Sequence, residues 1–189
     1  RPAGLVLAPT PELATQIGDP TATQIVAYLR RHPDAVSQRT DTLVIARAKL
    51  AQSVAAYEAL RARLKSFPIE THLLLGNHDD RETFLSVFPD LADEGGFVQG
   101  VHDAAGARCL FLDTNQPQTH AGRYCDDRLG WLTTRLDEHA GPFLLFMHHN
   151  PMPIHLAPLD QIRLLDDAAF RQLVDRYKSR IRHIFFGHC

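Results

Sequence analysis

Short apolar runs alternate along the chain with longer segments in which apolar residues recur every three or four positions. The runs are three to six residues long and end abruptly at a glycine or a polar residue, a pattern typical of buried strands. Four segments are predicted to be strands on this basis: 71–75, 108–113, 143–147 and 184–186.

The intervening segments have the apolar spacing of amphipathic helices. An aspartate followed by a proline, Asp19-Pro20, is a favourable helix start and predicts a helix over 21–32. Three further helices are predicted at 54–64, 127–138 and 168–177. Strands that alternate with helices indicate a layered α/β fold, in which functional side chains lie on loops just after strand ends.

Composition is that of an ordinary globular protein, with 44% apolar and 22% charged residues in a chain of 189. We expect a single domain over 1–189 that buries its core without disulfides. The net charge of −2 argues against duplex nucleic acid or an anionic membrane as partner. It is compatible with a small anionic substrate if metal ions supply local positive charge.

The cysteines and the apolar runs bear on location. Cys109, Cys125 and Cys189 form no Cys-x-x-Cys pair, so neither a disulfide framework nor a zinc ribbon is expected. The sequence contains no apolar run of the roughly 20 residues needed to span a bilayer, and its first residues lack a signal-peptide pattern. We therefore expect a cytoplasmic protein.

Histidine clusters follow three of the predicted strands, and the chain has eleven histidines in all. The clusters are Gly76-Asn77-His78-Asp79-Asp80, His148-His149-Asn150-Pro151 and Gly187-His188-Cys189. Imidazole nitrogen and amide oxygen suit zinc, iron and manganese, and two such ions can clamp a phosphate. A neighbouring histidine can protonate the leaving oxygen. One such cluster alone is weak evidence for metal binding. Three clusters, each at the end of a predicted strand, indicate a metal centre.

These motifs, in this order, resemble those of calcineurin-like metallophosphoesterases. Asn77-His78-Asp79-Asp80-Arg81, Phe111-Leu112-Asp113-Thr114 and the His-His-x-Pro pattern are most similar to the bacterial class III cyclic nucleotide phosphodiesterases. The resemblance runs from about Ala55 to Cys189 and is weaker before Ser53. It implies a layered α/β/β/α sandwich with two central sheets and a metal site along the strand ends.

The resemblance also implies residue roles. Asn77, His148 and His188 correspond to metal ligands, and Asp41 falls where the family has an aspartate that bridges both metals. His78 corresponds to the catalytic acid or to a phosphate-binding histidine. His149 and His155, in the same loop as His148, are expected to contact the substrate. Two transition metal ions (manganese, iron or zinc) are the implied cofactors.

The sequence departs from the family pattern in several places. The opening Asp-x-His motif is absent, Thr40 replaces the glycine before Asp41, and 37–53 lacks the usual apolar strand. The final histidine of Gly-His-x-His would fall one residue beyond Cys189. On the resemblance we expect a metallophosphoesterase domain that is incomplete at both ends of its metal site.

The favoured function is metal-dependent hydrolysis of a cyclic nucleotide or a similar small phosphodiester. The sequence does not determine whether the protein forms a homo-oligomer. A phosphomonoesterase or nucleotide pyrophosphatase of the same superfamily is an alternative that the motifs do not exclude. An inactive domain that serves as a binding or interaction module is another, and chance motifs in an unrelated α/β binding domain are a third. A P-loop nucleotide-binding site is not expected, because no GxxxxGK motif is present.

Overall fold

The computed structural model describes residues 5–6, 54–66, 68–104 and 106–188. The chain forms two compact units, which are considered separately below. The first contains Arg1–Leu73 and His78–Pro89, and the second contains Leu74–Asn77 and Asp90–Cys189. The helix predicted over 21–32 and the candidate ligand Asp41 lie outside the described residues.

The first unit contains two short parallel strands and two helices. Strand β1 (Leu5–Val6) pairs with β2 (Thr71–His72), and the helices are α4 (Val54–Lys65) and α5 (Arg81–Val87). Helix α4 confirms the helix predicted over 54–64. The strand predicted over 71–75 is shorter than expected, because its ladder with β1 comprises the two residue pairs Leu5–Thr71 and Val6–His72.

Tyr57 connects α4 to α5 and to the turn before it. Its ring meets the ring of Phe84 edge-on with centroids 5.3 Å apart, and its hydroxyl donates to Asp79 at 2.8 Å. Burial, followed by the charge of Asp79, raises the pKa of Tyr57. Asp80 caps α5 by accepting a hydrogen bond from the Thr83 amide at 2.8 Å. Asp79 and Asp80, the two residues after His78, are therefore held by Tyr57 and by the first turn of α5.

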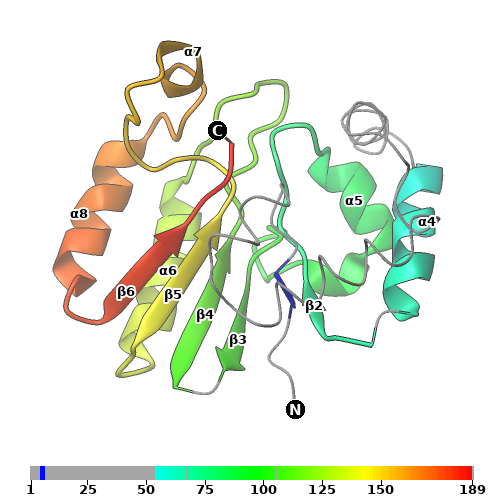
Figure 1. The fold of residues 1–189 in the computed structure, drawn as a ribbon, viewed down its shortest axis with the longest axis horizontal. Coiled ribbons are helices and arrows are strands. Elements are labelled where there is room, and N and C mark those ends of the chain that lie inside the picture. Colours follow the sequence, from blue (N-terminus) through cyan, green and yellow to red (C-terminus); the bar gives the residue numbers. More distant parts are fainter. Residues whose placement is uncertain (1–4, 7–53, 67, 105, 189) are drawn as a thin grey trace. The chain divides into compact units, whose positions relative to one another are not determined.

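The second unit is built on a four-stranded sheet in the order β3-β4-β5-β6 (Figure 1). Strands β3 (Gly100–Ala104) and β4 (Ala107–Leu112) form an antiparallel hairpin, whereas β5 (Phe143–Met147) and β6 (Ile181–Phe185) continue the sheet in parallel. Helix α6 (Asp126–Asp137) connects β4 to β5, and α8 (Asp167–Tyr177) precedes β6. The 3-10 turn η2 (Pro89–Leu91) and the short helix α7 (Ala157–Asp160) complete the described elements.

Successive side chains of a strand point to opposite faces of the sheet, and both faces of this sheet are apolar. On one face, Leu110 and Leu112 of β4 and Phe143, Leu145 and Met147 of β5 pack in a core with side chains of α6 and α8. The helical contribution to this core includes Leu132, Leu136, Phe170, Leu173 and Tyr177. Burial of these side chains stabilises the placement of both helices on the sheet, visible in Figure 1.

On the opposite face, three phenylalanines stack across neighbouring strands. Phe111, Phe146 and Phe185 are register partners, with ring centroids 5.2 and 4.8 Å apart. These cross-strand pairs fix the register of β4, β5 and β6, because a slip of one residue would transfer each ring to the other face. The ends of the three strands are thereby aligned.

Most predicted elements of the second unit are confirmed, and the differences have physical reasons. The strand predicted over 184–186 begins earlier, at Ile181, because Ile181 and His183 also pair with β5, with a register shift at Arg182 between them. Strand β3 was not predicted, since its sequence GVHDA contains no apolar run. None of the described helices is long and apolar enough to span a membrane.

Candidate metal centre

The parallel direction of β4, β5 and β6 brings the residues after these strands to one edge of the sheet. Asp113 follows β4, His148 follows β5, and Gly187 lies two residues after β6. The Gly187 amide donates to the His148 carbonyl at 3.0 Å, which continues the β5–β6 pairing as far as the first histidine of the cluster. The loops that carry His148 and His188 are therefore neighbours.

Three ligand-type atoms converge at this edge. Asn77 Oδ1 and His188 Nδ1 lie 3.0 and 2.9 Å from His148 Nε2. Two donors that each bind one ion at about 2.1 Å lie about 3.0 Å apart in octahedral coordination and about 3.4 Å apart in tetrahedral coordination. Two imidazole nitrogens and an amide oxygen are also a donor set that zinc, manganese and iron accept. These residues therefore fit one transition metal ion.

Local backbone geometry makes this convergence possible. A Cβ added at Gly76 would lie 3.2 Å from His148 Cε1, so the absence of a side chain lets the strand-end turn approach the imidazole closely. His188 adopts a left-handed backbone with φ of 69°, which is uncommon for a residue with a side chain. Strain of this kind is characteristic of functional sites.

His149 is placed differently from its neighbour. It is fully buried, its Nδ1 is 2.8 Å from Thr114 Oγ1, and its Nε2 is 3.1 Å from the His120 carbonyl oxygen. Because a carbonyl only accepts, Nε2 carries the proton and Nδ1 accepts from the Thr114 hydroxyl. Burial, followed by the nearby His188, lowers the pKa of His149 to about 3. Substrate contact through a ring nitrogen would require release of one of these bonds, and the predicted substrate role stays a prediction.

His120 contacts the candidate ligand Asn77, although it belongs to none of the three histidine clusters found in the sequence. Its Nδ1 is 3.1 Å from Asn77 Nδ2, so it accepts a hydrogen bond from the side-chain amide of the candidate ligand. That contact orients the amide with its nitrogen towards His120 and its oxygen towards His148. No local sequence pattern marks His120, because its partner is 43 positions away in the chain.

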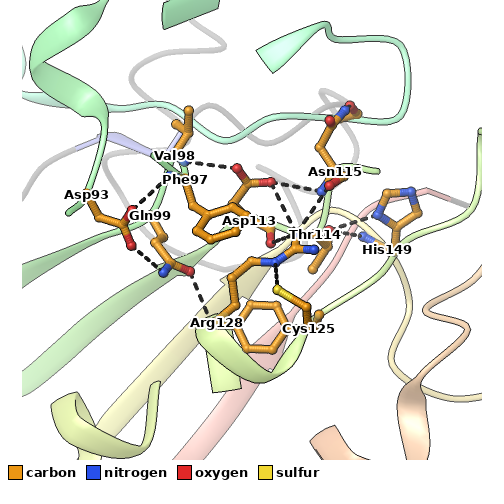
Figure 2. A network of polar contacts seen from close by, with 12 residues as sticks. Asp93, Phe97, Val98, Gln99, Asp113, Thr114, Asn115, Cys125, Arg128 and His149 are labelled. Carbon is orange, nitrogen blue, oxygen red and sulfur yellow. Dashed lines mark hydrogen bonds and ion pairs between the residues drawn. The ribbon is translucent and has the colours of Figure 1, made fainter. Parts of the chain in front are cut away.

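A buried polar network supports the loop after β4 (Figure 2). The Asp113 carboxylate accepts from the amides of Val98 and Asn115, each at 2.9 Å. Arg128, which is 3% exposed, donates to the carbonyls of Asp113 at 2.7 Å and Asn115 at 3.2 Å. The guanidinium also lies 4.7 Å from the centroid of the Phe97 ring. The network fixes the backbone of this loop on both sides.

The remaining candidate residues are placed as follows. His78 is exposed and belongs to the first unit. His155 is exposed, has φ of 63° and lies two residues before α7. Asp41 lies outside the described residues. The roles assigned to these three residues stay predictions.

Comparison with known proteins places the chain in a family. A family model described as calcineurin-like phosphoesterase matches residues 23–188. The chain belongs to the calcineurin-like phosphoesterase family. Members of this family generally use a pair of divalent metal ions, which agrees with the ligand set at the sheet edge. The resemblance noted from the motifs is thus confirmed, as is the mixed α/β fold class.

Individual relatives carry phosphodiesterase names. The chain is 35% identical over 166 residues to a probable cyclic nucleotide phosphodiesterase of Rhodopseudomonas palustris, covering 84% of this chain and 58% of the relative. A glycerophosphodiester phosphodiesterase of Enterobacter lignolyticus is 31% identical, with 85% and 57% covered. A cAMP/cGMP dual specificity phosphodiesterase of Mycobacterium tuberculosis is 32% identical, with 71% and 43% covered. The chain therefore spans about half the length of these curated relatives.

The close packing of Gly122 on His149 generates a prediction about the site's architecture. A Cβ at Gly122 would lie 2.4 Å from His149 Cγ and 2.8 Å from its Cβ, so the ring or the loop must move to accept a methyl group. We expect Gly122→Ala to lower the free energy of unfolding by about 1–3 kcal/mol, the usual cost of overpacking. Urea denaturation of parent and variant measures this difference.

Gly130→Ala is the matched control, because a Cβ at Gly130 meets nothing within 4 Å and the residue lies inside α6. We expect this second change to be neutral or to stabilise by up to about 1 kcal/mol, as alanine is the better helix former. Equal stabilities of the Gly122→Ala variant and the parent would contradict the packing argument.

Proposed function

We propose that the protein is a metal-dependent phosphodiesterase that hydrolyses a cyclic nucleotide or a similar small phosphodiester. The observation that carries this proposal is the convergence of Asn77 Oδ1, His148 Nε2 and His188 Nδ1 at the ends of parallel strands. The phosphodiesterase names of relatives from several bacteria support the choice of a diester over a monoester.

This geometry supports the proposed roles of Asn77, His148 and His188 as ligands. Asn77, His148 and His188 hold one ion, and Asp41 is proposed to bridge it to a second. A bound pair of ions would supply an activated water and would neutralise the charge of the phosphoryl oxygens. His120 keeps the oxygen of Asn77 directed at the ligand cluster, because the amide nitrogen is engaged by its ring. An amide that rotated would present a donor where the site requires an acceptor.

His78 is proposed to donate a proton to the leaving oxygen of the substrate. It follows Asn77 directly in the sequence and is exposed, so its imidazole is accessible to solvent and to a ligand. A histidine placed beside the leaving oxygen can act as a general acid. His155, also exposed, is proposed to contact the substrate on the side of α7.

A two-part experiment on the full-length protein tests the function. The protein is incubated with Mn²⁺, desalted and analysed for bound metal, and then assayed against cyclic AMP, a glycerophosphodiester and a phosphomonoester. We expect about two ions per chain and turnover of at least one diester above that of the monoester. A metal-free protein would contradict the metal centre, whereas preference for the monoester would contradict the assigned reaction.

The role of His78 predicts the effect of its removal. We expect His78→Ala to reduce diester turnover at least about a hundredfold with bound metal unchanged, the usual effect of losing a general acid. His183→Ala serves as control, because His183 is an exposed histidine on β6. A turnover equal to that of the parent would remove His78 from the mechanism.

The role of Asn77 predicts a loss of metal. We expect Asn77→Ala to lower the content of bound Mn²⁺ after desalting, because one of the converging ligand atoms is deleted. The exposed amide residue Gln161 provides the comparison, as Gln161→Ala should retain the metal content of the parent. If the two variants hold equal amounts of metal, Asn77 is not a ligand.

A further inference from the structure

The segment Asp113–Asn115 contacts two of the three described loops that supply candidate ligands. All three of its residues are buried. The Thr114 hydroxyl is 2.8 Å from Nδ1 of His149, the residue after His148. The Asn115 side chain donates through Nδ2 to the carbonyl of Gly76, the residue before Asn77, at 2.8 Å. One short segment therefore bridges two loops that are about seventy residues apart in the sequence.

The bridging segment is itself tightly held. The Asp113 carboxylate turns back on the Asn115 amide and also accepts from Val98, so the segment is tied to the chain before β3. Arg128 of α6 donates to the carbonyls of both Asp113 and Asn115. Figure 2 shows the guanidinium among these groups. Asn115 is thus a hydrogen-bond donor of fixed position and not a side chain that adapts to Gly76.

The Gly76 carbonyl, which accepts the hydrogen bond from Asn115, lies where a small movement would displace Asn77. The Gly76 carbonyl belongs to the peptide that begins Asn77, so its orientation determines where the Asn77 side chain starts. The same glycine already lies in close contact with His148, since an added Cβ would be 3.2 Å from Cε1. Rotation of this peptide would therefore change the separation of Asn77 Oδ1 and His148 Nε2, now 3.0 Å.

We propose that Asn115 is a positioning residue of the metal centre, which holds the Gly76 carbonyl and thereby sets Asn77 against His148. The inference rests on the proposed function, because it takes Asn77 and His148 as ligands. Outer residues that orient metal ligands commonly change metal affinity by about 10–100-fold when they are altered. Through its hydrogen bond to the Gly76 carbonyl, Asn115 acts on Asn77 by way of the backbone.

The test replaces Asn115 and compares metal affinity with stability. Asn115→Leu in the full-length protein retains the approximate shape of the side chain but lacks the donor. We expect its affinity for Mn²⁺, measured by competition with a chromophoric chelator, to fall at least about tenfold. Asn115→Ala is the second variant, measured in the same way if the leucine protein does not fold.

Tyr124→Phe is the matched control. Tyr124 is as buried as Asn115, and the change deletes one buried hydrogen bond, from the hydroxyl to Gln99 at 3.4 Å, in the same network. A merely structural role would lower the free energy of unfolding of both variants and leave Mn²⁺ affinity alone. We expect the control to bind Mn²⁺ within about twofold of the parent, because its lost bond does not reach Gly76.

The outcomes separate this inference from the proposed function. If the parent binds Mn²⁺ and the Asn115 variants bind it equally well, the positioning role is overturned and the metal centre stands. If the control loses as much affinity as the Asn115 variants, the effect is one of general stability and the positioning role is also overturned. A parent protein that binds no Mn²⁺ overturns both.

Discussion

The parallel pairing of β4, β5 and β6 is the constraint on which the described site depends. Parallel strands end at the same edge of a sheet, and the stacked rings of Phe111, Phe146 and Phe185 keep these three in register. Polar residues that follow the strands must then share a small volume at that edge. The hydrogen bond from Gly187 to the His148 carbonyl extends the alignment beyond the strands themselves.

The second unit could be predicted from sequence wherever one local pattern determined one element. The apolar run of β5 and the leucine stripe of α6 are such cases, because a buried strand and an amphipathic helix each have their own periodicity. Strand β3 has no such pattern, since it is a hairpin edge whose residues are half-buried or exposed. In the first unit, helix α5 has seven residues and is too short for a helical repeat to be recognised.

Some residues of the site could likewise be predicted from local sequence patterns, and others could not. Asn77, His148 and His188 could be selected because each stands directly after an apolar run, and the structure brings their ligand atoms together. His120, Asn115 and Arg128 could not, because their partners lie on other segments and their own surroundings in the sequence are those of an ordinary loop or helix. Contacts such as Asn115 to Gly76, 39 positions apart, exist only after the sheet has formed.

The pairing of Asp113 with Arg128 has a consequence for the electric field near the strand ends. Both side chains are almost completely buried, with a guanidinium nitrogen 3.8 Å from a carboxylate oxygen. A carboxylate left alone in this interior would repel an approaching anion over a long range, because little water is present to screen it. Next to the guanidinium it forms a nearly neutral dipole. The loop therefore gains rigid anchorage without adding net negative potential beside the strand ends.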